Sequence, residues 1–337
     1  MLAERLKELI RARGPMPFRD WMETALYDPS EGYYRRTDRR RWGREGDYRT
    51  SSERSELFAA TFARYFARLY DELGRPAEWT IDEGGAGDGR FAQRVLKTLA
   101  EEFPAVFAAT RYCASEIGND PETPNPSNPS LYFSNELLDA FPVHRVVNEG
   151  ELYVGLDSDN NFSWSVGPHS TPRLAEFLDE HSIQLAPGQI IEINLAIDDW
   201  LTSVASKLKQ GYVITVDYGA ESSELYDPAL RPHGTLRAFA KHGFVDDVLS
   251  APGDYDITSS VNWTQVKATG QRVGLDVVEF ASQDKFLLSA GLLEVLQLKS
   301  ERALTDSDKL KLTTDAREMI LPGGMASRFQ VLVQKRS

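Results

Sequence analysis

The stretch from Trp79 to Phe91 constrains the fold of this chain more than any other part of its sequence. It opens with a short run of strand-forming residues that ends at Glu83, and Gly85, Gly87 and Gly89 follow. Apolar residues then recur at every fourth position, which is typical of a helix. In a doubly wound sheet, a strand–turn–helix unit places its turn at the carboxyl edge, where ligands bind. Because glycines permit positive φ and expose bare backbone, the sequence predicts an α/β fold with a ligand site at this turn.

The pattern of this turn favours a cationic ligand. Dinucleotide sites carry G-x-G-x-x-G, whereas the glycines here follow G-x-G-x-G, and no Gly-Lys-Ser/Thr ending follows as in a phosphate-binding loop. An E-x-G-x-G-x-G turn suits S-adenosylmethionine (SAM), whose sulfonium and amino groups are cationic. Glu83 or Asp88 would attract those charges and repel a pyrophosphate. A tight turn without any ligand is the alternative.

Length and composition predict one large α/β domain with insertions, or two domains. The chain has 337 residues, of which 41% are hydrophobic, so it can bury a sizeable core. Residues 1–75 are expected to form an N-terminal helical extension with an active-site arm, and 76–337 a Rossmann-like domain. Within that domain we expect a small antiparallel insertion near 143–187 and a loop-rich active-site segment near 220–265.

Charge and cysteine content limit the partners and the compartment. The net charge of −13 argues against nucleic acid as a main partner, although the basic run 35–42 could be a basic arm or a solvated loop. No apolar run is long enough to span a membrane, and the first helix contains Glu4 and Glu8, unlike a signal peptide. Cys113 has no intramolecular partner, so we expect a reducing compartment, the cytoplasm. The oligomeric state stays open, a homodimer included.

Polar residues follow three further expected strands. Glu116 comes after the strand 111–115, Asn135 and Glu136 come after the strand 131–134, and Asp217 and Tyr218 come after the buried strand 212–216. Carboxyl ends of parallel strands share one edge of a sheet, and a carboxylate after the second strand is where a ribose diol is usually held. Glu116 is therefore the expected ribose ligand, with an ordinary surface carboxylate as the alternative.

A long helix is expected to begin near Thr50. Thr50 and Glu53 have the spacing of a capping box, and a wide apolar face follows them. The same helix N-terminus, with Thr50 and Ser51, could face the carboxylate of a ligand. The two readings are compatible.

At this point the chain resembles the MidA-type family of SAM-dependent methyltransferases, whose mitochondrial members are assembly factors for respiratory complex I. The resemblance runs from about Phe18 to the C-terminus and rests on motifs that recur in order. They are Ala25–Pro29 with Gly32–Tyr34, Gly46–Tyr48 with Thr50 and Ser51, Glu83–Gly89, Asn135–Val143, Asp217–Gly219, Gly234–Arg237, Pro252–Gly253 with Asp256–Thr258, and Phe286–Leu288.

The resemblance implies a class I methyltransferase fold with a mostly parallel seven-stranded sheet and SAM on the glycine turn. It also implies methylation of a protein arginine, in a subunit of complex I for the mitochondrial members. The family has Glu-Leu-Gly-Pro-Gly-x-Gly where this chain has Glu83-Gly84-Gly85-Ala86-Gly87-Asp88-Gly89. The cofactor residues expected here are Glu83, Gly85, Gly87, Asp88, Gly89, Glu116 and Asn135, together with Thr50 and Ser51.

Arginine methylation requires carboxylates that orient a guanidinium, which stays protonated in water. Glu136 is the leading candidate, and Asp139 lies one turn further on, where it could assist or cap a helix. Asp217 and Tyr218 are expected to close the pocket, and Asn135 to hold the substrate or the SAM amino group. The segments 46–52 and 234–258 are expected to cover the carboxyl edge of the sheet. No Cys or His pair has ligand spacing, so no metal is expected.

Two other functions remain open at this stage. One is a small-molecule methyltransferase of the same fold. A closed apolar pocket would favour this function, whereas an open acidic groove would favour a protein substrate. The other is a non-catalytic assembly chaperone that keeps the fold, which the altered residues Gly84, Ala86 and Asp88 leave open.

Overall fold

The protein consists of two compact units, each built from separate stretches of the chain. A computed structural model describes residues 1–36, 55–117, 128–240, 243–321 and 328–337. Unit 1 comprises Met1–Arg41, Leu138–Leu201 and Gly219–Thr269, and unit 2 comprises Trp42–Leu137, Thr202–Tyr218 and Gly270–Ser337. The domain boundary expected at residue 75 stays a prediction, since compactness alone does not define a domain.

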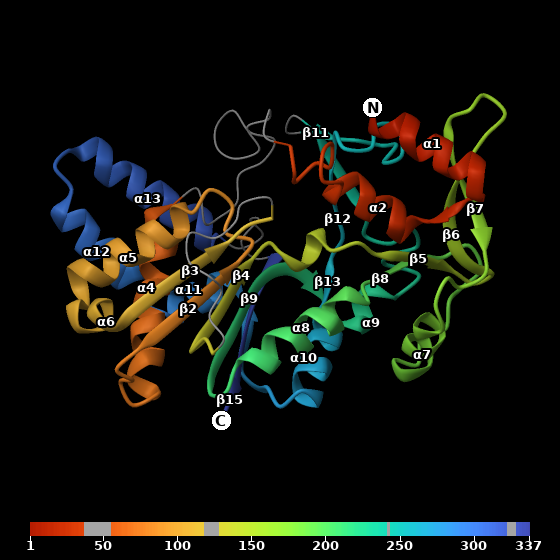
Figure 1. Cartoon of the computed structure of the whole chain (residues 1–337). Coiled ribbons are helices and arrows are strands. Elements are labelled where there is room, and N and C mark those ends of the chain that lie inside the picture. Colours follow the sequence, from red (N-terminus) through yellow and green to blue (C-terminus); the bar gives the residue numbers. More distant parts are fainter. Residues whose placement is uncertain (37–54, 118–127, 241–242, 322–327) are drawn as a thin grey trace. The chain divides into compact units, whose positions relative to one another are not determined.

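Unit 2 is organised around a mixed, mostly parallel sheet (Figure 1). Its order is β14-β15-β9-β4-β2-β3, and the seventh strand, β13, pairs with Gly219 and Ala220 at the end of β9, a part of the sheet that belongs to unit 1. The strands are β2 (Trp79–Gly84), β3 (Thr110–Ser115), β4 (Leu131–Asn135), β9 (Gly211–Ala220), β13 (Val261–Asn262), β14 (Asp276–Ser282) and β15 (Phe329–Arg336). Strands β3, β2, β4 and β9 pair in parallel, whereas β15 is antiparallel to both neighbours. The predicted class I methyltransferase-like fold is confirmed.

One face of this sheet is apolar because strand residues alternate between faces. On β2, Trp79 and Ile81 are buried in the main core of the unit, while Thr80 and Asp82 lie on the other side. The helices that contribute to that core are α4 (Glu56–Glu72), α5 (Arg90–Glu102), α6 (Pro104–Ala109), α11 (Gln283–Ser289), α12 (Leu292–Arg302) and α13 (Asp306–Ile320). The core is aromatic at its centre, where the Phe133 ring stacks on Phe91 at 4.6 Å and meets Phe62 edge-on at 5.2 Å.

Unit 1 contains an antiparallel sheet with the order β1-β6-β5-β8, and β7 pairs with β6. Its elements are α1 (Leu2–Arg13), β1 (Met16–Pro17), α2 (Phe18–Tyr27), β5 (His144–Val147), β6 (Gly150–Leu156), β7 (Phe162–Gly167), α7 (Pro172–Glu180) and β8 (Ile190–Ile193). The predicted antiparallel insertion is confirmed by β5, β6 and β7. The sequence did not predict β1, which joins the N-terminal segment to this sheet through β6.

The segment after β9 is more regular than the sequence suggested. It contains α9 (Ser222–Leu225), the small sheet β11 (Gly243–Phe244), β10 (Arg237–Ala240) and β12 (Asp256–Thr258), and then α10 (Trp263–Arg272). These strands are too short for alternation to show in the sequence. The expected helix near 286–295 is two helices, α11 and α12, because Gly291 adopts φ 98° between them.

The long helix α4 begins later than expected. Ser55 is its N-cap, and the Ser55 hydroxyl accepts a hydrogen bond from the Leu57 amide at 3.1 Å. The capping box predicted from Thr50 and Glu53 is therefore not the cap of this helix, and both residues lie outside the part that the structure describes.

We predict that Phe133→Ala lowers the free energy of unfolding by about 3–5 kcal/mol, because the cavity would open among the stacked rings. Chemical denaturation followed by tryptophan fluorescence measures this change. Phe244→Ala is the matched control, since Phe244 is 75% exposed and the change there should stay within about 1 kcal/mol. Equal effects for the two variants would contradict the assignment of Phe133 to the centre of the core.

Candidate active site

The glycine turn after β2 exposes bare backbone at the edge of the sheet. Gly85, Gly87 and Gly89 have φ values of 70°, 57° and 74°, in the left-handed region that favours glycine. The Ala86 amide donates to the Ser115 carbonyl at 3.0 Å, which ties the turn to β3. Within the described part of the chain, a Cβ built at Gly89 would meet no atom within 4 Å. The turn therefore presents backbone to open space at Gly89, at the start of α5, whereas Gly85 lies against the Leu137 side chain.

Glu116 closes this turn from the neighbouring strand. It follows β3, and its carboxylate accepts a hydrogen bond from the Gly87 amide at 2.9 Å. The structure thus brings together the two features that the sequence placed apart, the turn and the expected ribose ligand. Asp88 has a local role, since it accepts from the Arg90 amide at 3.1 Å and forms an ion pair with the Arg90 guanidinium at 2.8 Å.

Glu83 is buried rather than presented to a ligand. It is 4% exposed and accepts a hydrogen bond from the Tyr112 hydroxyl at 2.8 Å. Burial raises the pKa of Glu83 to about 8, Tyr112 lowers it and the charge of Glu116 raises it. At neutral pH the carboxyl of Glu83 is therefore mainly protonated. Sequence reasoning missed Tyr112, which the parallel register of β2 and β3 brings to the same face as Glu83.

Asn135 and Glu136 end β4 in an unusual conformation. Glu136 has φ 53°, which is uncommon for a residue other than glycine and typically marks functional or strained positions. The Glu136 amide donates to the Val216 carbonyl at 2.9 Å, which fixes this turn to β9. The Asn135 side-chain amide donates to the Glu136 carboxylate at 3.2 Å. This local network holds the carboxylate at the end of the strand.

Asp217 and Tyr218 lie beside this turn, on β9. The register pairs Asn135 with Val216, so Asp217 follows directly at the same edge of the sheet. Asp217 is fully buried and accepts a hydrogen bond from the Tyr218 amide at 2.9 Å. The Tyr218 ring packs edge-on against Phe329, with centroids 5.5 Å apart.

For three predicted site residues, Asp139, Thr50 and Ser51, a place in this group stays a prediction. Asp139 belongs to unit 1, in the short helix η1 (Leu138–Ala140), where its carbonyl accepts from the Ser259 amide at 2.9 Å. Thr50 and Ser51 lie outside the described residues, as does the segment 46–52. The coverage of the sheet edge by 234–258 stays a prediction, because that segment is in unit 1.

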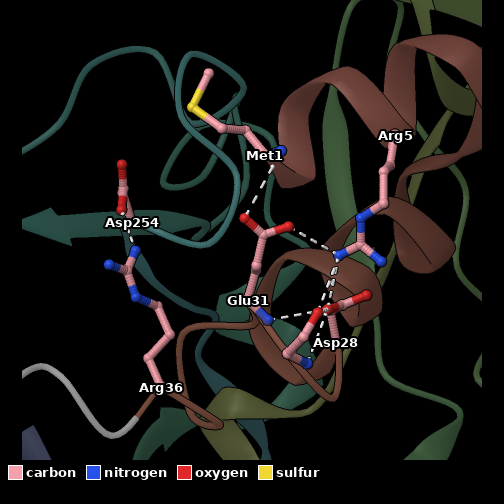
Figure 2. A network of polar contacts seen from close by, with 7 residues as sticks. Met1, Arg5, Asp28, Glu31, Arg36 and Asp254 are labelled. Atoms are coloured by element: carbon pink, nitrogen blue, oxygen red, sulfur yellow. Dashed lines mark hydrogen bonds and ion pairs between the residues drawn. The ribbon is translucent and has the colours of Figure 1, made fainter.

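Other motifs of the resemblance meet within unit 1 (Figure 2). Asp28 accepts from the Ser30 and Glu31 amides, both at 3.0 Å, and from the Arg5 guanidinium at 2.8 Å. Burial alone would raise the pKa of Asp28, but these hydrogen bonds hold it well below its usual range. The Arg36 guanidinium pairs with Asp254 at 2.9 Å. The segment 27–36 is thus joined to the segment 252–258 by one ion pair, between Arg36 and Asp254.

The residues of the sheet edge fit SAM. Bare backbone at the turn can approach the ligand, and Glu116 supplies a carboxylate at the end of the second strand of the unit. Within the described ranges, no group of three or more His, Cys, Asp and Glu residues is arranged to hold a metal ion. In the same part of the chain, every helix is too short or too polar for a membrane crossing.

We predict that Glu83 makes the protein less stable as the pH rises. Its carboxyl ionises near pH 4.5 in an unfolded chain but near pH 8 in the folded protein, so unfolding releases a proton between these values. Glu83→Gln keeps an acceptor for Tyr112 but cannot ionise. The free energy of unfolding of this variant, minus that of the wild type, should therefore be more positive at pH 8 than at pH 5. Thermal unfolding across pH measures this, with the exposed Glu78→Gln as control. A constant difference between Glu83→Gln and the wild type would contradict the buried, protonated state.

Comparison with solved structures shows a close overall match. A protein of Burkholderia thailandensis bound to S-adenosylhomocysteine has a TM-score of 0.84 and 28% identity, and the match covers 99% of this chain and 92% of that chain. A ligand-free crystal structure of a protein from the same organism has a TM-score of 0.78 and 27% identity, over 99% and 91% of the two chains. The cofactor of the chain is therefore SAM.

Curated relatives are similar over most of their length. The Drosophila melanogaster protein arginine methyltransferase NDUFAF7 homolog is 25% identical over 81% of this chain and 70% of its own. The NDUFAF7 protein of Mus musculus is 25% identical over 95% and 81%. Both are named as mitochondrial proteins, which overturns the cytoplasmic location expected from the sequence. The single cysteine indicated only a reducing compartment, and this does not distinguish the cytoplasm from others.

The chain also matches the sequence model of a family of S-adenosyl-L-methionine-dependent methyltransferases, over residues 61–121 and 119–281. These residues contain the glycine turn and the three strand ends that carry Glu116, Glu136 and Asp217. On the strength of this match, the chain belongs to that family of SAM-dependent methyltransferases.

Proposed function

We propose that this methyltransferase acts on an arginine of a protein, and that Glu136 orients the guanidinium. The observation that carries the proposal is the strained strand end, where a glutamate with φ 53° is fixed by the Val216 carbonyl and by Asn135. A structure that holds a carboxylate in an unfavourable backbone conformation gains nothing in stability from it. The names of the curated relatives support the same substrate class.

The proposal gives each residue of the edge a separate task. Bound SAM supplies a methyl group on a sulfonium sulfur. The backbone of Gly85, Gly87 and Gly89 would bind the cofactor, and Glu116 would accept hydrogen bonds from its ribose. Glu136 would form charge-assisted hydrogen bonds to the guanidinium and so present one nitrogen in line with the methyl group. Asp217 is a second carboxylate at the same edge; it is fully buried and would stabilise positive charge.

The test of the proposed function is a search for the methyl mark itself. The tagged wild-type protein captures its partners, which are then incubated with labelled SAM and digested for mass spectrometry. Label on arginine side chains of captured proteins, absent with Glu136→Gln, is the expected result. A subunit of respiratory complex I is the proposed target, by resemblance to the mitochondrial family members. Label on small molecules, or on no arginine, would contradict the proposal.

We predict that Gly87→Val abolishes SAM binding while the protein stays folded. A branched side chain would project where the cofactor is proposed to lie, and φ 57° would strain it. Gly74→Val is the matched control, because Gly74 has φ 80° and, in the described part of the chain, no atom within 4 Å of an added Cβ. Calorimetric titration should show SAM binding for the control alone. Normal SAM affinity in folded Gly87→Val would remove the turn from the cofactor site.

We predict that Glu136→Gln lowers turnover about a hundredfold or more with little change in SAM affinity. The amide keeps the shape and one acceptor oxygen but loses the charge, and tenfold in rate corresponds to about 1.4 kcal/mol. A methyl-transfer assay and SAM calorimetry on the same variant measure both quantities. An equal loss of SAM binding would assign Glu136 to the cofactor, and unchanged turnover would make this turn structural.

A further inference from the structure

The face of the main sheet opposite the aromatic core carries a row of buried polar side chains. Asp82 on β2 is 1% exposed, Ser134 on β4 is fully buried and Thr215 on β9 is 1% exposed. The register pairs Ser134 with both Gly84 and Thr215, and Asp82 with Tyr132, two residues further from the carboxyl edge. Paired residues in a sheet point to the same face, so these side chains form one continuous row across three neighbouring strands.

This row has unused hydrogen-bonding capacity. Among the described residues, none bonds to either carboxylate oxygen of Asp82, to the Ser134 hydroxyl or to the Thr215 hydroxyl. Leaving a buried carboxylate without any partner is costly, and such groups in proteins are normally hydrated by ordered water. The row has the composition of a small hydration site inside the protein.

Gly84, one of the positions where the chain departs from the family pattern, leaves space on this face that the Tyr132 hydroxyl occupies. A Cβ at Gly84 would collide with the Tyr132 hydroxyl. Leucine, which the family pattern has here, would therefore displace Tyr132 from its place beside Asp82. Gly84 thus lets the Tyr132 hydroxyl, a further polar group, join the row where leucine would place an apolar side chain.

The row begins at the carboxyl edge where the chemistry is proposed. Ser134 and Thr215 each lie two positions before Glu136 and Asp217 in the sequence. Strands rise about 3.3 Å per residue, so Asp82 lies roughly 7–10 Å from this edge, a span that two or three water molecules would bridge.

The charged groups around Asp82 leave it able to take up a proton. Burial raises the pKa of Asp82 to about 6, and Lys207 at the end of α8 (Ala196–Lys207) lowers it. Cys113 and Tyr132 are its titratable neighbours in the sheet, while Glu83 and Tyr112 lie on the opposite face. At neutral pH Asp82 is mainly a carboxylate, so it can accept a proton and release it again.

We propose that Asp82, Ser134 and Thr215 hold a chain of ordered water, through which Asp82 accepts the proton that arginine methylation releases. This inference rests on the proposed function. A guanidinium nitrogen forms a bond to the methyl carbon while the carbon–sulfur bond breaks and its electron pair stays on sulfur. Substrate and product are both guanidinium cations, so one nitrogen proton must leave. It passes along the water to the Asp82 carboxylate and from there to solvent.

The experiment compares Asp82→Asn with the wild type in the full chain. SAM affinity by calorimetry should change less than about twofold, because Asp82 does not face the turn. Turnover on the arginine substrate at pH 7 should fall about tenfold or more. The rise of kcat with pH near pH 6, expected in the wild type, should be lost. Asp276→Asn, an exposed carboxylate at the start of β14, is the matched control and should keep the wild-type profile.

A second pair of variants keeps the proposal testable if Asp82→Asn does not fold. Ser134→Ala and Thr215→Val leave the carboxylate but remove its water partners, so each should lower kcat and move its rise to higher pH. Wild-type turnover and pH profile in folded Asp82→Asn, or in both hydroxyl variants, would overturn the relay while leaving arginine methylation intact. A wild-type enzyme that methylates no arginine would instead overturn the proposed function and, with it, the need for this relay.

Discussion

The parallel register of β3, β2, β4 and β9 is the constraint on which the site depends. Because these four strands run in one direction, the turn after β2 and the residues after β3, β4 and β9 meet at a single edge. Two interactions then fix the details. The Glu116 carboxylate accepts from the Gly87 amide, and the Glu136 amide donates to the Val216 carbonyl. Each joins neighbouring strands at their ends, so the backbone of the proposed cofactor site is held in place in the free protein.

The two faces of this sheet serve different purposes. The apolar face, with Phe133 at its centre, packs against α4 and α5 and supplies the burial that stabilises the unit. The other face carries Asp82, Ser134 and Thr215, whose burial costs free energy unless water or a partner satisfies them. Because their burial does not stabilise the fold, we relate these side chains to the proposed proton transfer. Glu83 shows the same principle on the apolar face, where Tyr112 satisfies a buried carboxyl.

Much of this architecture could be predicted from the sequence. Glycine spacing, apolar strands that end in polar residues and the antiparallel insertion were read from local patterns, which survive in the structure because each is a short-range property. The properties that depend on pairing could not be predicted. Burial raises the pKa of Glu83 although the Tyr112 hydroxyl lowers it, and Gly84 leaves space that the Tyr132 hydroxyl occupies. Both contacts depend on the strand register. The late start of α4 at Ser55 shows that a capping pattern alone does not locate a helix end. The predicted cytoplasmic location was wrong, because a single cysteine cannot identify a compartment.

The central claim is that the sheet edge of unit 2 binds SAM with its glycine turn and Glu116. A crystal structure of the wild-type protein with S-adenosylhomocysteine tests it most directly. The account predicts ribose oxygens within hydrogen-bonding distance of the Glu116 carboxylate and the amino-acid part of the ligand against the backbone of Gly85–Gly89. Ligand density at another edge, or a ribose held by residues other than Glu116, would contradict it.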